Sequence, residues 1–515
     1  SSSYIMTTRF RDWVDDFLTA LTGANVDVSA DKIPIIDDSA DATKYITPAE
    51  LVRETGLSAS SGSSLVGFVQ SGTGAVARTM QAKGRDIVSV QDFGAVADGN
   101  YGTGTGTDNS PFVQAAIDAL SITGGGIVFV PGGILGQANS SYKLASQITV
   151  PSGVSLVGLG KWSSIFFAPT AFANAGGLIR LNGVGGNPTN LSGVGVIAQT
   201  GGAGGYGIVS VANGTFLRDL WVNGFTSGAG VRLESTDNFL SDFTIELCSH
   251  GLQCLESHQN ISHGVLFGNT GTSALISNNA SVDAGPVIFN SVRATGASPM
   301  GFQVSGGKNV IFNGCSATHD NNAGLATKAF SAEASSSNVI FNGCIAKILG
   351  AVSATGLGFH VSASDNIALN GNTATGFDIG LKIQGGSTKV QLGLNILLGN
   401  TTDLSILDGS SEVRMGPNTF ATFAEATPAS IASATALTLP VGPDQIIVTG
   451  TTTITSIVAT GQARRTVTLQ FTGILTFTAG SNLKLAGNFV TSADDTITLY
   501  CDGTNWFELA RSVNA

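Results

Sequence analysis

The sequence is poor in charged side chains and contains no long apolar run. Charged residues make up 11% of the 515 residues, under half the usual share of about 25%. Basic residues number 24 and acidic residues 35, a net charge of −11, and they form no basic run of the kind that contacts nucleic-acid phosphates. No apolar stretch reaches the ~18 to 20 residues of a membrane helix, and the first residues do not resemble a cleavable signal. We therefore expect no nucleic-acid partner, no insertion into a membrane and no secretory signal.

Cysteine is also scarce. The five cysteines, Cys248, Cys254, Cys315, Cys344 and Cys501, show no CxxC spacing and no neighbouring histidine pattern. We expect them to be small buried hydrophobic side chains of a protein made in a reducing cytoplasm. The sequence predicts neither a metal site nor a cofactor.

Glycine, in contrast, is abundant, and one heptapeptide is repeated. Glycine supplies 68 of 515 residues, about 13% against an average near 7%, which suits many short strands joined by turns. NVIFNGC occurs at Asn309–Cys315 and again at Asn338–Cys344. It belongs to a ladder of short segments, DLWVN, DFTIE, VLFGN, PVIFN, NVIFN, NVIFN and NIALN, most of which close on Asn. They close at positions 223, 246, 269, 290, 313, 342 and 370, in steps of 23, 23, 21, 23, 29 and 28 residues.

This period predicts an all-β fold built around a right-handed parallel β-helix. Periods of 20 to 50 residues indicate stacked repeats, and strand-only units of this length form β-helical coils about 4.8 Å apart. Asn tolerates the left-handed turn conformation, and its amide can bond to the next Asn in the stack. Cys315 and Cys344 then become stacked neighbours.

Both ends of the chain depart from the repeat. Phe10, Trp13, Val14, Phe17, Leu18 and Leu21 follow helical spacing and predict an amphipathic helix, followed by a Ser/Gly-rich linker at Ser58–Ser64. A second helix is expected near residues 110–120, with Ser110 as N-cap and Pro111 at the first position, plugging the open end of the β-helix. We expect an N-terminal region at 1–85, the β-helix at 86–418 and a separate β-rich module at 419–515.

Three segments carry a resemblance. VSVQDFGAVADG (Val88–Gly99), TDNSPFVQAAIDAL (Thr107–Leu120) and GGGIVFVPGG (Gly124–Gly133) resemble the opening of the pectate-lyase-like β-helix of bacteriophage tailspikes. The resemblance implies a homotrimeric virion protein, assembled in the host cytoplasm. Its N-terminal region would attach to the phage tail or baseplate, its β-helix would meet a host surface polysaccharide, and its C-terminal module would drive trimerisation.

Glycoside hydrolysis requires two carboxylates, and a β-helix can stack them on adjacent rungs. Glu234 and Glu256 each lie four residues before an Asn, at Asn238 and Asn260. The same slot in later coils holds small residues, which are Ser305, Ala334 and Ser362. Glu234 and Glu256 are therefore a candidate catalytic pair, although two solvated surface acids would give the same pattern.

Glu246 is a third catalytic candidate, because it is the only acid in the closing-Asn ladder. His250 follows it four residues later. Trp221 lies one coil earlier, on the strand face alternate to Leu220 and Val222. Trp221 and His250 are candidate substrate ligands, but a trimer contact for Trp221 and a plain turn role for Glu246 fit as well. His319 and Asp320 fall in the longer 29-residue coil, where extra residues must loop out, and are further candidate ligands.

Three functions remain open from the sequence. The first is a tailspike that binds and hydrolyses a host capsule or lipopolysaccharide chain, and the second is a binding-only tail protein of the same fold. The third is a polysaccharide lyase, which would need a basic proton abstractor. Arg232, Arg293, Lys328 and Lys347 are scattered, so hydrolysis is the leading hypothesis.

Overall fold

The fold is described from a computed structural model of the chain. The structure describes residues 33–37, 42–46, 59–121, 124–133, 140–183, 188–278, 285–296, 299–320, 327–350, 355–407, 410–421, 423–425, 429–440 and 444–514. The chain divides into two compact units, Ser1–Ile87 and Val88–Ala515. The predicted amphipathic helix between Phe10 and Leu21 lies outside the described residues.

In the part of the first unit that the structure describes, the helices and strands are all short. Strands β1 (Ile33–Asp37) and β2 (Ala42–Ile46) form an antiparallel hairpin. Strands β3 (Gly67–Phe68) and β4 (Arg78–Thr79) form a second antiparallel pair, followed by the short helix α3 (Met80–Gly84). Strand β5 (Ile87–Ser89) leads into the second unit.

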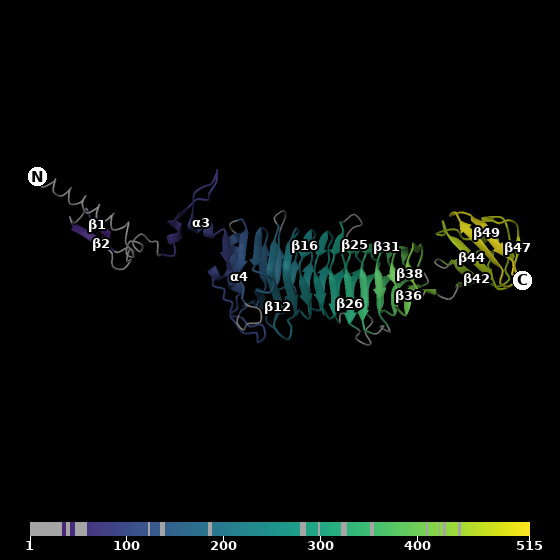
Figure 1. The fold of residues 1–515 in the computed structure, drawn as a ribbon, viewed down its shortest axis with the longest axis horizontal. Helices are drawn as coiled ribbons and strands as arrows, with labels where there is room; N and C mark the ends of the chain where they lie inside the picture. The colour runs from purple at the N-terminus through teal and green to yellow at the C-terminus, as the bar shows by residue number, and fades with distance from the viewer. Residues whose placement is uncertain are drawn as a thin grey trace. The chain divides into compact units, whose positions relative to one another are not determined.

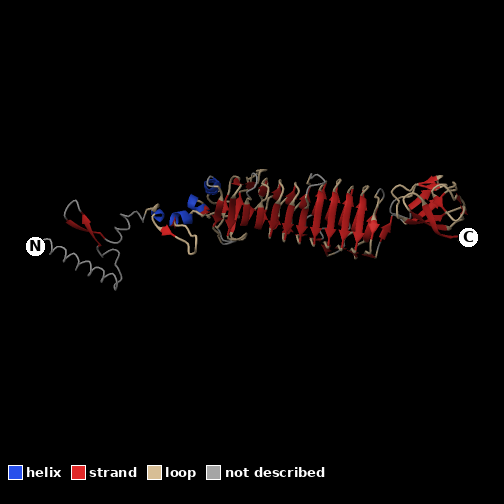
Figure 2. Ribbon diagram, turned by 90° about the horizontal axis from the view of Figure 1, so that it is seen from above, coloured by secondary structure: helices blue, strands red, loops and turns tan. Residues whose placement is uncertain are grey.

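The second unit contains a parallel β-helix of about 13 turns, which confirms the predicted fold class. Figures 1 and 2 show its strands stacked side by side, each running across the direction of the stack. Each coil contributes one strand to each of three faces, which we name A, B and C. Parallel pairing between coils fixes which residues lie above one another.

Face A consists of β8 (Ile148–Pro151), β11 (Ile179–Asn182), β13 (Ile208–Ser210), β15 (Ala229–Leu233), β18 (His250–Cys254), β21 (Thr272–Ile276), β24 (Met300–Ser305), β27 (Lys328–Glu333), β30 (Leu357–Ser362), β33 (Ile379–Gln384), β36 (Thr402–Ile406) and β39 (Phe423–Glu425). Face B consists of β6 (Gly126–Val130), β9 (Val154–Gly158), the first halves of β12 (Asn190–Ala198) and β14 (Phe216–Asn223), β16 (Asn238–Ser241), β19 (Gln259–Ser262), β22 (Val287–Asn290), β25 (Lys308–Asn313), β28 (Ser337–Asn342), β31 (Asp365–Asn370), β34 (Thr388–Gly393) and β37 (Arg414–Met415). Face C consists of β7 (Tyr142–Lys143), β10 (Ser164–Ala168), the second halves of β12 and β14, β17 (Thr244–Glu246), β20 (Val265–Phe267), β23 (Arg293–Gly296), β26 (Ser316–Asp320), β29 (Ile345–Leu349), β32 (Thr373–Thr375), β35 (Ile396–Leu397) and β38 (Thr419–Phe420).

In most strands alternate residues point into a continuous apolar core, which contains two columns of phenylalanine. Phe302, Phe330 and Phe359 stack on face A, with neighbouring ring centroids 5.0 Å apart and nearly parallel. Phe312 and Phe341 stack on face B at 5.1 Å. The two columns meet edge to face, since the rings of Phe330 and Phe341 lie 5.9 Å apart at 75°. The rings thus join successive coils along the axis.

Asparagine ladders reinforce the corners, as the sequence predicted. Asn309, Asn338 and Asn366 adopt left-handed φ values of 55°, 54° and 55°. Asn338 donates to the amide oxygen of Asn309 at 2.8 Å, and Asn366 donates to that of Asn338 at 2.7 Å. A second ladder joins the closing residues, because Asn342 donates to Asn313 at 3.1 Å. All five cysteines are free and buried, and the predicted stacking of Cys315 and Cys344 is confirmed by their adjacent positions in paired coils.

Helix α4 (Ser110–Ser121) covers the first coil. It buries Val113, Ala116, Ile117 and Leu120, in agreement with the helix that the sequence predicts at the open end of the β-helix. Gln114 accepts from the backbone N–H of Thr149 at 2.8 Å and donates to its carbonyl at 3.1 Å, so it pairs with the strand edge of β8. The helix begins at Ser110 itself, so the prediction of Ser110 as the N-cap is wrong. Asp108 Oδ1 accepts hydrogen bonds from the backbone N–H and the hydroxyl of Ser110.

The last part of the chain has its own apolar core, which includes the fully buried Trp506. Its main sheet contains β40 (Ala429–Ala432), β42 (Gln445–Thr449), β44 (Thr466–Phe471), β46 (Leu483–Lys484), β48 (Thr496–Cys501) and β49 (Trp506–Ser512). Two small sheets pair β41 (Ala436–Leu437) with β43 (Ser456–Ile457) and β45 (Thr476–Phe477) with β47 (Phe489–Val490). Trimerisation by this module stays a prediction. No helix in the described part of the chain is long and apolar enough to cross a membrane.

Candidate functional site

Two of the predicted site residues, Trp221 and Glu246, meet on face C. Trp221 lies on β14 and Glu246 ends β17, one coil further on. The indole Nε1 of Trp221 donates to Oε1 of Glu246 at 2.6 Å, and Asn223 Nδ2 donates to the same oxygen at 2.9 Å. These two donors fix the orientation of the carboxylate. No donor in the described part of the chain reaches its second oxygen, which leaves Oε2 available to a ligand.

A second tryptophan, which the sequence analysis missed, extends this group. The rings of Trp162 and Trp221 lie 4.7 Å apart at 44°, and the Trp162 side chain is 42% exposed. Trp221 itself is buried against Ile165, Phe167 and Ile197, so it supports Trp162 from behind. On the next coil the register partner of Glu246 is the exposed Phe267.

We name Trp162, Trp221, Asn223, Glu246 and Phe267 the aromatic–carboxylate site. Aromatic rings lie on the coils before and after a single oriented carboxylate. Exposed aromatic faces can stack on the apolar face of a sugar ring, and a carboxylate accepts hydroxyl hydrogens. The arrangement is therefore suited to binding a glycan along the axis of the β-helix.

Cationic and acidic groups flank the site at the corner between faces B and C. Lys161 Nζ donates to the carbonyl oxygen of Asp242 at 2.9 Å and lies 3.8 Å from Oδ1 of Asp219. The same ammonium lies 5.8 Å from the Trp162 ring centroid. Asp219 and Asp242 adopt left-handed φ values of 50° and 56°, so both are turn residues. Their column continues with His263 and Ser291 and then with the turn glycines Gly314, Gly343 and Gly371.

The ladder that singled out Glu246 was partly wrong. Asn223, Glu246 and Phe267 share one column of face C, whereas Asn290, Asn313 and Asn342 close strands of face B. Glu246 therefore does not replace an Asn of the second asparagine ladder. Glu246 nevertheless lies between the aromatic side chains of Trp221 and Phe267, on the coils before and after it.

The predicted stacking of Glu234 on Glu256 is also wrong, by one residue. Leu233 pairs with Cys254, so Glu234 lies opposite Leu255, one residue before Glu256. Glu234 instead forms an ion pair with Arg232 Nε at 2.6 Å on face A. Arg232 Nη1 also donates to the Tyr206 hydroxyl at 2.6 Å, and the guanidinium carbon of Arg232 lies 4.9 Å from the centroid of the Tyr206 ring. A catalytic role for Glu234 and Glu256 stays a prediction.

The remaining predicted ligands lie apart from the aromatic–carboxylate site. His250 begins β18 on face A, where burial lowers the pKa of its imidazole, so the ring is neutral near pH 7. His319 is buried within β26, and Asp320 ends that strand exposed to solvent. The predicted binding roles of these three residues stay predictions.

The acid that lies in the Glu234 column is Glu333, which the sequence analysis missed. Ser305 pairs with Glu333. The residue equivalent to Ser305 on this coil is therefore Glu333, and the predicted equivalence of Ser305 and Ala334 is wrong by one residue. Glu333 Oε1 lies 2.7 Å from Lys328 Nζ and 3.0 Å from His360 Nδ1. Burial opposes ionisation of Glu333, but the hydrogen bonds from His360 and Lys328 outweigh it and lower its pKa from 4.5 to about 2. Glu333 therefore acts as the anionic centre of a structural cluster.

This cluster makes stability depend on pH. Because the folded-state pKa of Glu333 is depressed, its contribution is complete above pH 4.5 and is lost as pH falls toward 2. The shift corresponds to roughly 3 kcal/mol of unfolding free energy at neutral pH. We expect Glu333→Gln to lower stability at pH 7 and to flatten its decline between pH 4.5 and pH 2, as measured by urea unfolding. An identical pH dependence in wild type and variant would contradict this assignment.

Comparison with known proteins gives two partial relatives, and no family model matches the chain. A stretch of 105 residues is 36% identical to the tail spike protein of Shigella phage Sf6, and a stretch of 93 residues is 31% identical to the mannuronan C5-epimerase AlgE3 of Azotobacter vinelandii. These stretches cover 20% and 18% of the chain, but only 15% and 5% of the relatives' own lengths. The first match confirms the predicted resemblance to phage tailspikes.

Solved structures with a similar fold include further proteins of both kinds. The tailspike protein of E. coli bacteriophage HK620, in complex with a pentasaccharide, is 11% identical, with a TM-score of 0.48 over 87% of this chain and 89% of that one. The A-module of the mannuronan C-5 epimerase AlgE4 of Azotobacter vinelandii is 14% identical, with a TM-score of 0.43 over 65% of this chain and all of that one.

Proposed function

We propose that the chain is a phage tailspike whose β-helix binds a host bacterial surface polysaccharide, either a capsule or a lipopolysaccharide chain, at the aromatic–carboxylate site. The observation that carries the proposal is the oriented Glu246 carboxylate, with one oxygen held by Trp221 and Asn223 and the other open. The exposed ring of Trp162 supplies an adjoining stacking surface. The sequence match to a tail spike protein supports the same proposal.

The proposal includes the assembly implied by the resemblance. The protein would be a homotrimer in the virion, with residues 1–85 attached to the phage tail or baseplate and residues 419–515 serving trimerisation. Assembly would take place in the host cytoplasm. The net charge of −11 agrees with a partner other than nucleic acid.

Hydrolysis of the bound polysaccharide is the second candidate function, with Glu246 as the acid or base. A rigidly oriented carboxylate next to a sugar-stacking surface favours it. A hydrolase also needs a second carboxylate or an activated water at the opposite face of the sugar. Asp219 and Asp242, at the neighbouring corner, are the acids that could provide it. Binding without cleavage and lyase chemistry are the alternatives.

Trp162 provides a test of binding. We expect Trp162→Ala to weaken binding of the recognised polysaccharide by about tenfold or more, because truncating a Trp at the centre of a binding surface typically has an effect of this size. Affinity electrophoresis against a panel of bacterial capsules and lipopolysaccharides measures it. The matched control is Phe239→Ala on face B, where the ring is 44% exposed, close to the 42% of Trp162. Equal losses in both variants would contradict a site on face C.

A further inference from the structure

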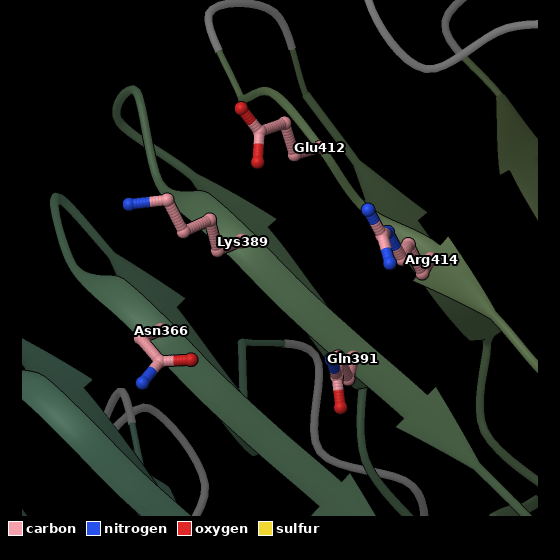
Figure 3. Close-up of a pocket in the computed structure, with 5 residues that line it drawn as sticks. All are labelled: Asn366, Lys389, Gln391, Glu412 and Arg414. Carbon is pink, nitrogen blue, oxygen red and sulfur yellow. The ribbon is translucent and has the colours of Figure 1, made fainter. Parts of the chain in front are cut away.

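A small charged pocket lies on face B, toward the last coils of the β-helix. It has a volume of about 150 Å³ and is lined by Asn366, Lys389, Gln391, Glu412 and Arg414 (Figure 3). Figure 3 shows Asn366, Lys389 and Glu412 on successive coils, with Gln391 and Arg414 further along the strands. Gln391 and Arg414 are register partners on β34 and β37. The pocket shares neither face nor coils with the aromatic–carboxylate site.

The charges of this pocket are not neutralised internally. The structure gives no ion pair between Glu412 and Lys389 or Arg414, and Arg414 has none with any other described residue. Lys389 lies 3.5 Å from Asp365, but both side chains are exposed, and such surface pairs are weak. The Arg414 guanidinium is therefore available to an anion from solvent, and the Lys389 ammonium is held only by a weak surface pair.

The residue types at this corner also change here, while the backbone conformation stays the same. The corner column that contains Asn309, Asn338 and Asn366 continues with Lys389 and Glu412, whose φ values are 52° and 55°. Asn tolerates this left-handed conformation because its short amide can hydrogen-bond locally, whereas Lys and Glu adopt it at a cost. At the point where the ladder loses its asparagines, two charged side chains line a pocket instead.

We propose that this pocket binds the carboxylate of a uronic acid residue in an acidic polysaccharide. The planar guanidinium of Arg414 can hold a carboxylate through two parallel hydrogen bonds, and Lys389 adds a second positive charge. Glu412 can accept sugar hydroxyls, and its own charge disfavours doubly charged groups such as phosphate. The volume is below the roughly 300–1,000 Å³ of sites that enclose a whole ligand, so it suits one group of a longer chain.

This inference deepens the proposed function, since it names acidic chains as the polysaccharide class. The test uses the full chain in affinity electrophoresis through gels containing polygalacturonate or its carboxyl-reduced form. We expect wild type to bind polygalacturonate more tightly than the reduced polymer. Arg414→Gln should weaken binding to polygalacturonate about tenfold and leave binding to the reduced polymer unchanged. Glu412→Gln should strengthen binding to polygalacturonate, because it removes a like charge.

The matched control is Lys382→Gln, which removes one positive charge from face A of the same coil as Lys389. Equal binding of both polymers by wild type, no binding of polygalacturonate, or equal losses in Arg414→Gln and Lys382→Gln would overturn the inference. Trp162→Ala separates it from the proposed function. Weakening in Trp162→Ala alone would overturn the pocket and keep the aromatic–carboxylate site, and weakening in Arg414→Gln alone would do the reverse.

Discussion

Replacing Phe330 by alanine is expected to lower the free energy of unfolding of the β-helix by about 3–5 kcal/mol. The ring is fully buried and stacks between Phe302 and Phe359, at 5.0 Å from each. It also meets Phe312 and Phe341 edge to face, at 6.2 and 5.9 Å. Truncation therefore opens a cavity where both phenylalanine columns converge, and neighbouring coils lose their contact across it.

Urea unfolding followed by far-ultraviolet circular dichroism measures this loss. The matched control is Phe216→Ala, because that ring also stacks on another, Phe239 at 5.0 Å, but does so on the exposed outer surface. Its loss is expected to stay below about 1 kcal/mol, since little apolar area is returned to water. Similar losses at both positions would mean that the phenylalanine columns do not dominate the stability of the β-helix.

Replacing Glu246 by glutamine is expected to reduce the release of reducing ends from a cleaved polysaccharide by about 100-fold or more, the range of a lost general acid or base. The glutamine carbonyl can still accept from Trp221 Nε1 and Asn223 Nδ2, so the site keeps its shape and loses only its charge. The effect is therefore expected in the rate of release, with the fold and the binding surface intact.

The control for Glu246→Gln is Asp237→Asn, which also removes one carboxylate. Asp237 is an exposed turn residue with a φ of 62°, in the corner column that later coils fill with asparagine. We expect it to leave release unchanged. Loss of release in Glu234→Gln but not in Glu246→Gln would move the chemistry to Arg232 and Tyr206 on face A. Binding without release by wild type would favour the binding-only alternative.

The sequence predicted the fold because the fold repeats itself. NVIFNGC and its relatives record the corner asparagines and inward phenylalanines that each coil needs, and those contacts are present. Helix α4 was predictable for a similar reason, since its apolar spacing matches the surface that it covers.

The register of the site was harder to predict, because different residue types can make the same hydrogen bond at a corner of the coil. Gln259 occupies the slot of Asn238, and the amides of both residues donate to the carbonyl oxygen of Ser235 at 2.6 Å. Counting from Asn260 therefore shifted Glu256 by one residue and created a false pair with Glu234. A slip of one residue also moves a side chain to the other surface of a strand.

The contacts that build the aromatic–carboxylate site join distant parts of the sequence. Trp162 precedes Trp221 by 59 residues and lies outside the repeat that identified Glu246. Trp221 and Glu246 were both predicted, but their hydrogen bond was not. That hydrogen bond depends on the pairing register of β14 and β17, which places Glu246 opposite Asn223. The register follows from the length of the coil and not from the residue types.

The most direct test of the proposed site is a crystal structure of the Glu246→Gln protein with an oligosaccharide from the polysaccharide that wild type binds. We expect a sugar ring stacked on Trp162, with a hydroxyl group bonded to the side chain at position 246 and the oligosaccharide running along face C toward Phe267. An oligosaccharide bound on face A beside Arg232 and Tyr206, with face C empty, would contradict it.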